Sequence, residues 1–506
     1  MAFNIAEPSN RALLGHVRPS DWTPPSPLPH YDLVVVGGGT AGLVAAAGAA
    51  GLGARVALIE RDKLGGDCLN TGCVPSKALL ASAHAAAAVR RAPALGVQAT
   101  LEAVDFPAVM ARVRATRTTI APHDSAARFA GLGVHVFFGS AAFTSAASLA
   151  VNGTPLSFSR AVIATGARPA ASGIDGLADA DVLTSESVFE LTEQPRRLAV
   201  LGGGPQGCEM AQAFSRLGTR VYLLEAAPRL MSREDADASD VLRHALVDDG
   251  VTVLTGATVH HAVRADGGLR LTITRGAVGD TLDVDRVLVA VGRRANTDGL
   301  GLERAGVTTA KDGRVAVNDF LQSRNRRVYA AGDACLPWQF THAADWSARL
   351  VIRNALFAGR ARVSGLMLPR VTFTDPELAA IGLTTEQARV RNVAVTTYDV
   401  PFASVDRAVT DSAGTGFLRV LVAAGRDRIL GATIVGPRAG ELVSELAVAM
   451  RAGMGLSRLS SVVHPYPGYA DAIRQAADAC NRTRLTPRAA GLLRAWLSLR
   501  RRLPHG

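Results

Sequence analysis

Apolar and small residues near the start of the chain follow a strand–helix–strand pattern. Residues 31–36 form a nearly continuous apolar run, and residues 55–59 form a second one. Between them, residues 43–52 are all alanine, glycine, leucine or valine, the composition of a helix that packs closely on a sheet. Strands that are buried on both faces have continuous apolar runs, so the pattern predicts a parallel β-α-β unit.

A glycine-rich turn joins the first strand to this helix. Gly37, Gly39 and Gly42 have the spacing G-x-G-x-x-G, and Glu60 ends the second strand. The first glycine permits a tight turn, the second admits a pyrophosphate, and the third lets the helix approach the strand. The helix N-terminus then presents N–H groups to the phosphates, and the carboxylate reaches a ribose hydroxyl. The turn therefore predicts a dinucleotide site.

The same arrangement recurs 165 positions later. Gly202, Gly204, Gly207 and Glu225 repeat the spacing of the first set, again between apolar runs. One glycine fingerprint is weak evidence, whereas two with identical internal spacing are difficult to produce by chance. The repeat predicts an α/β fold with two Rossmann-like dinucleotide-binding domains.

The remaining pattern completes the domain organisation. Helices are expected between residues 85 and 130, and further strands are expected at 134–138, 149–151, 161–163, 286–291 and 328–333. From residue 371 the chain alternates strands with an amphipathic helix at 439–452, which predicts a C-terminal α+β unit. Residues 487–502 predict a basic amphipathic helix.

Two cysteines lie close together after the first glycine turn. Four residues separate Cys68 from Cys73, with Gly72 before the second cysteine and Pro75 after it. A regular helix would place the two side chains on different faces, roughly 7.5 Å apart along its axis, whereas a disulfide needs Cα atoms within about 7 Å. Gly72 and Pro75 permit a distorted helix start that allows a bridge. Two unpaired cysteines near a turn are the simpler interpretation, and zinc would need a second ligand pair.

Composition limits the other classes of protein. The 506 residues include five cysteines, too few for a secreted disulfide framework, and one close pair is typical of a cytoplasmic redox site. The formal net charge of +11 comes without a nucleic-acid-binding signature, so no nucleic-acid partner is expected. No uncharged run reaches the ~18 apolar residues of a membrane span. Residues 1–30 are predicted to be a polar tail, and no metal site is expected.

The doubled glycine loop, the cysteine pair and the C-terminal unit together resemble the class I pyridine nucleotide–disulfide oxidoreductases. Dihydrolipoamide dehydrogenase, glutathione reductase and mercuric reductase belong to this family. The resemblance is most specific at Gly66-Asp67-Cys68 and Pro75-Ser76-Lys77, and it is greatest to mercuric reductase-like members. It implies a homodimer whose domains are an FAD-binding domain at 31–182 completed by 293–365, an NAD(P)-binding domain at 183–292, a dimerisation domain at 366–480 and a basic helix at 481–506.

The resemblance also implies cofactor contacts. The residues expected to bind FAD, besides the first glycine loop, are Glu60, Lys77, Gly139, Thr165, Gly166, Asp333, His342 and Ala343. Those expected to bind NADH or NADPH, besides the second loop, are Glu225, Val259, Gly292 and Arg293. NADH is favoured because a carboxylate accepts a hydrogen bond from the ribose 2′-hydroxyl and repels a 2′-phosphate.

The resemblance assigns the chemistry to the cysteine pair. Cys73 would be the charge-transfer thiolate against the flavin, and Cys68 would be the interchange thiol that faces the substrate. Lys77 would approach the flavin and pair with Glu209. Hydride from the nicotinamide would reduce the flavin, and two electrons would pass to the Cys68–Cys73 disulfide.

The C-terminal segment departs from the family pattern. Disulfide-reducing members carry a His-Pro sequence with a glutamate five residues after the histidine. The histidine acts as the acid–base for the interchange thiol. Here, anchoring the pattern on His464 leaves no acid at that position, whereas anchoring it on Asp471 places Tyr466 at the histidine position. We prefer the second frame because it retains Pro467 and an acid. A His464 that only forms hydrogen bonds at the dimer interface is the simpler alternative.

The predicted function is an FAD- and NAD(P)H-dependent oxidoreductase that passes electrons through Cys68 and Cys73 to a small disulfide or electrophile. A mercuric reductase is an alternative, although the chain has only Cys480 where those enzymes carry a C-terminal vicinal cysteine pair. Dihydrolipoamide dehydrogenase-type activity is a further alternative. Another is a non-catalytic redox-sensing flavoprotein whose basic C-terminal helix contacts a membrane surface.

Overall fold

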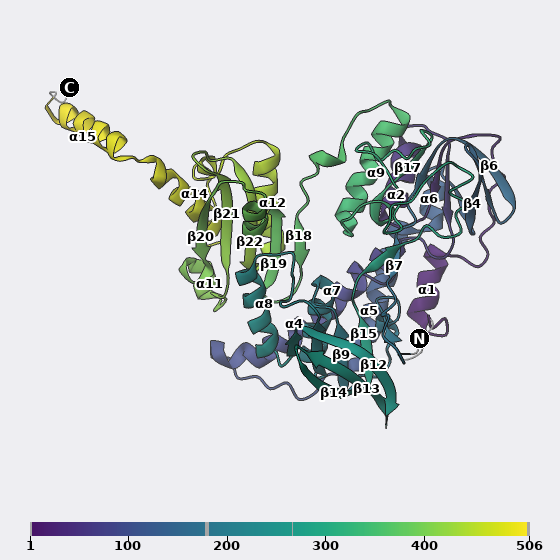
Figure 1. Cartoon of the computed structure of the whole chain (residues 1–506), viewed down its shortest axis with the longest axis horizontal. Coiled ribbons are helices and arrows are strands. Elements are labelled where there is room, and N and C mark those ends of the chain that lie inside the picture. Colours follow the sequence, from purple (N-terminus) through teal and green to yellow (C-terminus); the bar gives the residue numbers. More distant parts are fainter. Residues whose placement is uncertain (1–2, 178–181, 266, 503–506) are drawn as a thin grey trace. The chain divides into compact units, whose positions relative to one another are not determined.

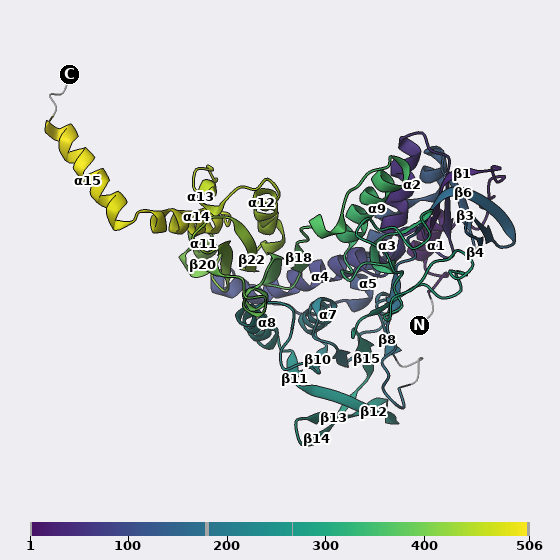
Figure 2. The same ribbon diagram turned by 45° about the horizontal axis from the view of Figure 1, so that its top comes forward.

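The chain forms two compact units (Figure 1 and Figure 2). The computed structural model describes residues 3–177, 182–265 and 267–502. The first unit contains the chain up to residue 228 together with 249–366, and the second contains 229–248 together with the chain from 367 onwards. The first unit therefore holds both glycine loops and the cysteine pair, and the second holds the C-terminal candidates.

The first unit is built on a parallel sheet that continues into antiparallel strands. The strand order is β3-β2-β1-β6-β5-β4, and β17 pairs with β6. The bounds are β1 Tyr31–Val36, β2 Val56–Glu60, β3 His135–Phe138, β4 Ala141–Ser145, β5 Ser148–Val151, β6 Thr154–Ile163 and β17 Val328–Ala330. Strands β1, β2, β3, β6 and β17 run parallel to one another, so their carboxyl ends share one edge of the sheet.

Small residues let two helices pack closely beside this sheet. Helix α2 (Thr40–Gly51) contacts α9 (Thr341–Leu356), and both lie next to the parallel strands (Figure 1). A Cβ atom added at Gly48 of α2 would come within 2.6 Å of the Ile352 side chain on α9. The alanine- and glycine-rich composition of α2 therefore sets the spacing between the helices, as its sequence indicates.

A second parallel sheet in the first unit contains the second glycine loop. Its order is β11-β10-β9-β15-β8, and β12-β13-β14 form an antiparallel sheet that packs on it; β16 pairs with β7. The bounds are β7 Ala167–Pro169, β8 Val182–Leu183, β9 Arg197–Leu201, β10 Arg220–Glu225, β11 Thr252–Thr255, β12 Ala257–Ala265, β13 Gly268–Arg275, β14 Val278–Val284, β15 Arg286–Val289 and β16 Arg293–Ala295. The antiparallel sheet is absent from the sequence prediction, although Leu269, Leu271 and Ile273 alternate with exposed residues as in a half-buried strand.

Helices surround the cysteine pair and both nucleotide folds. The other helices of the first unit are α1 Pro8–Val17, α3 Gly66–Asn70, α4 Cys73–Arg91, α5 Phe106–Ile120, α6 Ala126–Gly131 and α7 Pro205–Arg216. Short 3-10 turns are η1 Ala92–Leu95, η2 Ala121–Asp124, η4 Val188–Glu190, η5 Gly332–Ala334 and η6 Val363–Gly365. Helix α4 packs against both α5 and α7, so the cysteine segment is held between the two nucleotide folds of this unit.

Part of the segment predicted as a polar tail folds into helix α1. Leu13 and Val17 lie one turn apart and are fully buried. The Glu7 carboxylate caps the helix by accepting a hydrogen bond from the Asn10 backbone N–H at 2.8 Å. An apolar pair one helical turn apart is a short signal, so the sequence alone did not reveal that α1 packs against α5.

A buried ionic network joins α1 to the cysteine segment. Arg117 of α5 is 1% exposed and contacts Glu190 Oε1 at 2.8 Å. The same guanidinium donates to the Asn10 side chain at 2.9 Å and to the Asn70 carbonyl at 2.9 Å. Asn10 in turn donates to Glu190 Oε2 at 2.8 Å. A buried charge needs such partners, because desolvation of an unpaired ion costs several kcal/mol.

The second unit is an antiparallel sheet covered by helices around one apolar cluster. The strand order is β18-β19-β22-β21-β20, which confirms the predicted α+β unit. The strands are β18 Arg370–Thr372, β19 Glu377–Gly382, β20 Val395–Pro401, β21 Phe417–Ala423 and β22 Ile429–Gly436, and η7 is Phe402–Ser404. The helices are α8 Ala236–Asp248, α10 Thr385–Val390, α11 Asp406–Thr410, α12 Ala439–Arg451, α13 Leu456–Leu459, α14 Asp471–Arg484 and α15 Pro487–Arg502. Among the described helices, none has the length and apolarity needed to cross a membrane.

Helix α8 and the turn before it pack with the second unit, although the sequence analysis places residues 183–292 in one nucleotide-binding domain. Glu234 accepts two hydrogen bonds from Arg370, at 2.9 and 3.0 Å. Asp235 accepts one from the Thr433 hydroxyl at 2.9 Å. Ionic and polar contacts over a long sequence separation therefore decide which unit this segment belongs to.

We expect Glu190→Ala to release α1, because Arg117 would remain buried without its counter-ion. Removing one partner of a buried ion pair costs about 3–5 kcal/mol. Hydrogen–deuterium exchange should show faster exchange of the α1 amides and of the segment around Asn70. Asp298→Ala is the control, because it removes an exposed partner of Arg168 and such pairs contribute about 0–1 kcal/mol. Equal exchange in the two variants would contradict a structural role for the network.

Candidate functional site

The two glycine loops have the same local geometry. Gly37 has φ +109° and Gly202 has φ +106°, a backbone conformation that favours glycine. A Cβ atom at Gly42 or Gly207 would lie 1.8 Å from the carbonyl oxygen of Gly37 or Gly202, respectively. The first and third glycine of each loop are therefore required by the protein's own packing.

The second glycine of each loop instead faces open space. A Cβ atom at Gly204 would meet no atom within 4 Å, and one at Gly39 would meet only the Gly66 Cα at 3.5 Å. Gly39 and Gly204 are also the N-cap residues of α2 and α7, and neither helix start has a side-chain cap. Free backbone N–H groups at an uncapped helix start suit a pyrophosphate, so both loops fit a dinucleotide.

Each loop is braced by the acid that ends the next strand. Glu60 accepts a hydrogen bond from the Gly38 N–H at 2.6 Å, and Glu225 accepts one from the Gly203 N–H at 2.6 Å. The second oxygen of each carboxylate accepts from a backbone N–H two residues farther along the chain, at 2.7 Å. Burial raises the pKa of Glu60, and these N–H groups oppose that shift. The sequence analysis predicted that the two acids bind ribose hydroxyls. In the structure, both carboxylates also hold the backbone of their glycine loops in place.

The expected FAD contacts gather at one edge of the first sheet. They follow the carboxyl ends of its parallel strands: Gly139 after β3, Glu60 at the end of β2, Gly37 after β1, Thr165 and Gly166 after β6, and Asp333 after β17. His342 and Ala343 lie in the first turn of α9. Ligands of open α/β sheets bind at this edge, so the arrangement suits a nucleotide.

The expected nicotinamide-dinucleotide contacts are less concentrated. Glu225 ends β10, and Gly292 follows β15 with φ +125°. Val259 lies in β12, where it packs against the apolar cluster between the two sheets. Arg293 lies with the first nucleotide site instead: it pairs with Asp67, lies 3.8 Å from Asp333 and donates to the Ala167 carbonyl at 2.6 Å.

The helix break between the cysteines is the feature that brings their sulfurs together. Helix α3 ends at Asn70, and α4 begins at Cys73. Gly72 has φ −131° and ψ −111°, and a Cβ atom there would lie 2.8 Å from the Asp67 carbonyl oxygen. The distorted helix start predicted from Gly72 and Pro75 is therefore present. Cys68 and Cys73 are free thiols that hydrogen-bond each other, the dithiol form of the predicted pair.

The surroundings shift the pKa values of the two thiols in opposite directions. The hydrogen bond from Cys68, together with smaller effects of Thr341 and Lys77, lowers the pKa of Cys73 to about 6 against the opposing effect of burial. Thr341 Oγ1 lies 3.2 Å from the Cys73 sulfur. The same hydrogen bond, together with burial, raises the pKa of Cys68. Cys73 is therefore a thiolate near pH 7, and Cys68 keeps its proton.

An ion pair stands beside Cys73. Lys77, one turn along α4, contacts Glu209 of α7 at 2.7 Å, as the resemblance implied. Glu209 is buried, so its charge requires this partner. Farther along the site, burial raises the pKa of Asp333 to about 6, although Arg293 opposes the shift. The site therefore contains cations placed to stabilise thiolate and carboxylate charge.

The C-terminal candidates do not form the family's dyad. His464 Nε2 lies 2.9 Å from Glu445 Oε1, its Nδ1 lies 3.0 Å from the Val462 carbonyl oxygen, and its side chain is 7% exposed. Asp471, at the start of α14, accepts hydrogen bonds from Arg474 and Gln475. Both ring nitrogens of His464 are therefore occupied within the second unit.

Tyr466 has a different environment. Its residue is 75% exposed, and its hydroxyl donates to Asp406 Oδ2 at 2.8 Å. That hydrogen bond raises the pKa of the phenol, so Tyr466 is neutral near pH 7. On the surface of the second unit, Tyr466 is more accessible to a group from outside than His464 is.

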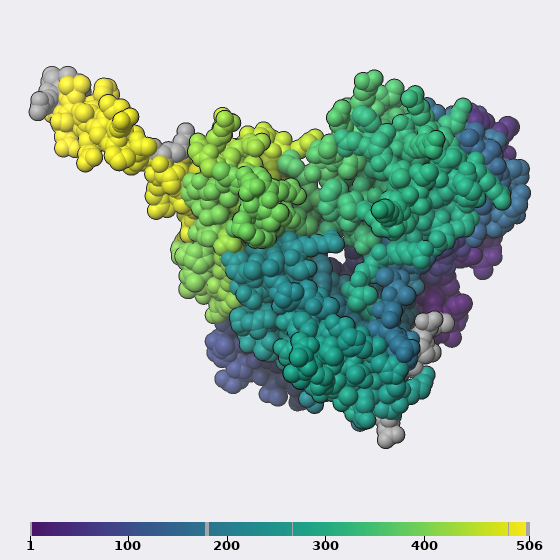
Figure 3. Space-filling model, viewed as in Figure 1, coloured from purple at the N-terminus to yellow at the C-terminus, as the bar shows by residue number. Residues whose placement is uncertain are grey.

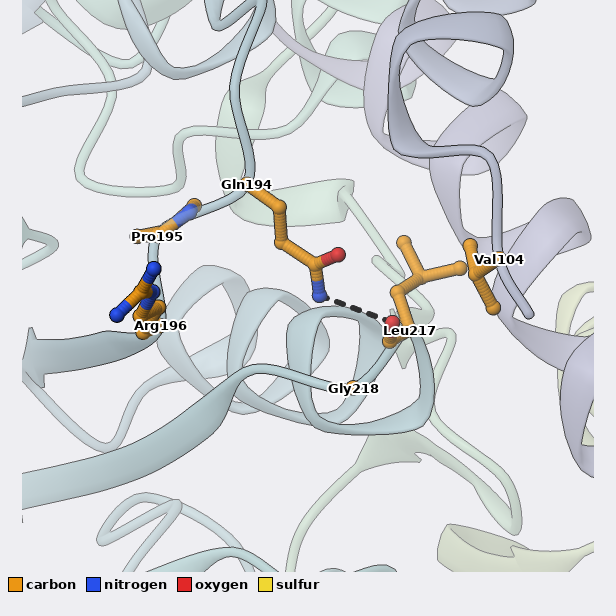
Figure 4. A pocket seen from close by; sticks show the side chains of 6 residues that line it. All are labelled: Val104, Gln194, Pro195, Arg196, Leu217 and Gly218. Atoms are coloured by element: carbon orange, nitrogen blue, oxygen red, sulfur yellow. Dashed lines mark hydrogen bonds between the residues drawn. The ribbon is translucent and has the colours of Figure 1, made fainter.

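A separate pocket in the first unit is lined by none of the candidate cofactor-binding or catalytic residues. Its volume is about 270 Å³, and the Gln194 side chain crosses it to donate to the Leu217 carbonyl at 2.9 Å (Figure 4). It is lined by Val104, Gln194, Pro195, Arg196, Leu217 and Gly218. It has no thiol or carboxylate, so we do not assign it to the redox site.

Several partners of the site were missed from the sequence. Thr341 contacts Cys73, Asp67 pairs with Arg293, Glu445 contacts His464, and Asp406 accepts from Tyr466. Only Asp67 lies in a motif that the sequence analysis singled out. The other three are single polar residues far from their partners along the chain, and no local pattern marks them.

The doubled nucleotide fold and the cysteine pair define a dinucleotide-dependent oxidoreductase of the disulfide-reductase class. The family model for pyridine nucleotide-disulphide oxidoreductase matches residues 31–348, and the model for its dimerisation domain matches residues 368–477. The chain therefore belongs to the pyridine nucleotide–disulphide oxidoreductase family, as predicted. Members of this family are enzymes that depend on FAD and use NAD(P)H.

Similar proteins include two kinds of enzyme from this family. A mercuric reductase of Streptomyces lividans is 38% identical over 464 residues, which are 88% of this chain and 95% of the relative. A dihydrolipoyl dehydrogenase of Thermus scotoductus is 34% identical over 459 residues, which are 89% and 98% of the two chains.

Solved structures agree with this family. The HOCl-induced flavoprotein disulfide reductase RclA from Escherichia coli, in its Cu(II) complex, superposes with a TM-score of 0.80 at 27% identity, over 89% of this chain and all of that one. LpdA from Mycobacterium tuberculosis superposes with a TM-score of 0.81 at 27% identity, over 90% of this chain and all of that one. The predicted fold class is confirmed.

We expect Cys68→Ser to show a long-wavelength thiolate-to-flavin absorption band without prior reduction, because the serine hydroxyl still donates to the Cys73 thiolate. Raising the pH should develop the band around pH 6, well below the usual cysteine pKa near 8.5. Thr341→Val should move the midpoint upward, since it removes one hydrogen bond to the sulfur. A Cys68→Ser protein that lacks the band at every pH would show that Cys73 does not face the flavin.

Proposed function

We propose that the chain is an NADH-dependent FAD oxidoreductase that reduces a small disulfide or electrophile at Cys68. The observation that carries the proposal is the polarised dithiol at the helix break, with its Cys73 thiolate beside Thr341 and the Lys77–Glu209 pair. When bound, FAD supplies the transfer of two electrons from the nicotinamide to the Cys68–Cys73 disulfide. The two glycine loops, with Glu60 and Glu225, would hold the two dinucleotides.

The two thiols then react one after the other in the reduction of the acceptor. Cys68 gives up its proton and attacks one sulfur of a disulfide, and the other acceptor sulfur leaves as a thiol. The Cys73 thiolate next attacks Cys68, closes the internal disulfide and releases the second acceptor sulfur. Two electrons thus reach the acceptor together with the Cys68 proton; the second acceptor sulfur leaves as a thiolate, and solvent supplies its proton. The raised pKa of Cys68 makes removal of its proton a costly step that benefits from a base.

The preference for NADH rests on Glu225 and on the positions of two arginines. A carboxylate at the end of β10 suits a ribose 2′-hydroxyl and repels a 2′-phosphate. Arg220 begins the same strand, about 17 Å from Glu225 along it, and stacks on the Tyr222 ring. Arg229 donates to the carbonyls of Ser232 and Glu234. Neither arginine is therefore placed to bind a 2′-phosphate.

We expect native protein to use NADH at least about tenfold better than NADPH, a difference of about 1.4 kcal/mol in transition-state binding. The measurement is kcat/KM for each cofactor with one fixed acceptor. Glu225→Ala should reduce the NADH-to-NADPH ratio of kcat/KM, mainly by lowering kcat/KM for NADH. Glu193→Ala is a control outside the proposed site. A native preference for NADPH would mean that cations elsewhere bind the 2′-phosphate.

We further propose that the protein is a homodimer and that Tyr466 of the partner subunit serves the interchange thiol. The chain carries the family's dimerisation domain. Within the second unit, the accessible Tyr466 is better placed to meet a thiol from outside than His464, whose ring nitrogens are both occupied. A neutral phenol donates a hydrogen bond to a departing thiolate but is a weak base near pH 7. Dialkyl disulfides should therefore be poor substrates compared with electrophiles that need only a thiolate.

We expect Tyr466→Phe to lower turnover of glutathione disulfide and lipoamide roughly tenfold or more, at the low end of acid–base contributions. Turnover of a quinone reduced at the flavin should not change. His464→Ala should lower thermal stability, since it leaves Glu445 without its partner, and should change the disulfide rate little. Tyr398→Phe, which removes a hydroxyl that contacts Thr483, is the matched control. Fast disulfide turnover that collapses in His464→Ala alone would identify His464 as the working base.

Hg(II) is a second candidate acceptor, favoured by the relatives named mercuric reductase. A thiolate and a thiol side by side suit a soft metal. Against this, Cys480 lies buried on α14 with no neighbouring cysteine in the sequence, so it cannot supply the C-terminal pair that delivers mercury in those enzymes. Volatile mercury released under NADH would establish this acceptor.

A further inference from the structure

Helix α15, at the C-terminal end, has a composition unlike the rest of the chain. Residues 481–506 contain seven arginines and no aspartate or glutamate, so they carry most of the formal net charge of +11. The family's dimerisation model ends at residue 477, before this segment. The proposed redox function therefore does not account for it.

The apolar side chains of α15 are exposed on one stripe. Leu492, Leu493, Trp496 and Leu499 recur at the spacing of one helix face, and Leu492 is 74% exposed. None of the side chains described in this helix is buried, and none belongs to the apolar cluster of the second unit. Figure 3 shows the helix as the yellow projection of that unit. A continuous apolar stripe of this kind normally has a partner.

The arginines identify the chemistry of that partner. Arg494 and Arg501 lie on the opposite side of the helix from the apolar stripe, whereas Arg488 lies at the edge of the stripe and Arg500 lies within it. An anionic phospholipid surface matches both faces: the leucines and the tryptophan enter the interface, and the arginines remain at the phosphate level. The helix is about 24 Å long and arginine-rich, so it would lie along the surface and not cross it.

We propose that α15 binds the protein to the surface of an anionic membrane, with the helix parallel to the bilayer plane. A nucleic acid would use the arginines but leave Leu492, Leu493, Trp496 and Leu499 in water. A second copy of α15 would cover the leucines but bring its arginines together without a counter-charge. The membrane surface is the occupant that satisfies both faces. This inference does not rest on the proposed dithiol chemistry.

The experiment is flotation of the full-length FAD-loaded protein with vesicles of phosphatidylcholine, with and without 30% phosphatidylglycerol (on the order of plasma-membrane charge). We expect binding to the anionic vesicles and loss of binding at high salt. Arg500→Gln/Arg501→Gln should weaken partitioning roughly 30-fold, from about fivefold per arginine. Leu492→Gln/Leu493→Gln should weaken it at least about tenfold. NADH oxidation with a soluble quinone should stay at the native rate in all variants.

The controls change equivalent residues elsewhere in the second unit. Val390→Gln removes an exposed apolar side chain, and Arg391→Gln removes an exposed charge beside it; neither should affect flotation. Full binding by Leu492→Gln/Leu493→Gln, with release of the vesicles by duplex DNA, would overturn the proposal in favour of a polyanion site. Equal binding to neutral and anionic vesicles, or loss of the native oligomeric state in the leucine variant, would also overturn it.

Discussion

The buried Arg117 guanidinium holds the helix break on which the cysteine pair depends. It contacts Glu190 and the Asn70 carbonyl, which belongs to the last residue of α3. Asn70 also donates to the carbonyls of Leu64 and Gly66. The buried charge cannot move without losing its counter-ion, so it constrains the backbone between the two cysteines. The proximity of the thiols, and hence the pKa difference between them, follows from this constraint.

The two nucleotide folds use the same local contacts to shape their glycine loops. In each, a terminal glutamate accepts the N–H of the residue between the first two glycines, and the third glycine lies against the first. The carboxylate is thus part of the loop's own structure as well as a candidate ribose ligand. Removing it would alter both cofactor discrimination and the shape of the phosphate-binding turn, so the two effects have to be separated by comparing cofactors.

The C-terminal unit combines a retained scaffold with altered chemistry. Its antiparallel sheet and its match to the family's dimerisation domain are those of its relatives. The residues that the sequence analysis assigned to the acid–base positions have their own partners: His464 contacts Glu445, and the exposed Tyr466 donates to Asp406. If Tyr466 serves the interchange thiol as proposed, its phenol would favour acceptors that require little proton transfer. Under that proposal, the acceptor class depends on these few side chains more than on the fold.

Local patterns in the sequence were enough for the paired glycine loops, the strands around them, the helix break at Gly72 and the Lys77–Glu209 pair implied by the family resemblance. Turn chemistry and apolar periodicity act over a few residues, and they can be recognised without the fold. The contact of Thr341 with Cys73 spans 268 positions, and Arg117 meets Glu190 across 73. Only the packed structure selected these partners, because burial decides which of many similar polar side chains must find a counterpart, and burial is a property of the whole chain.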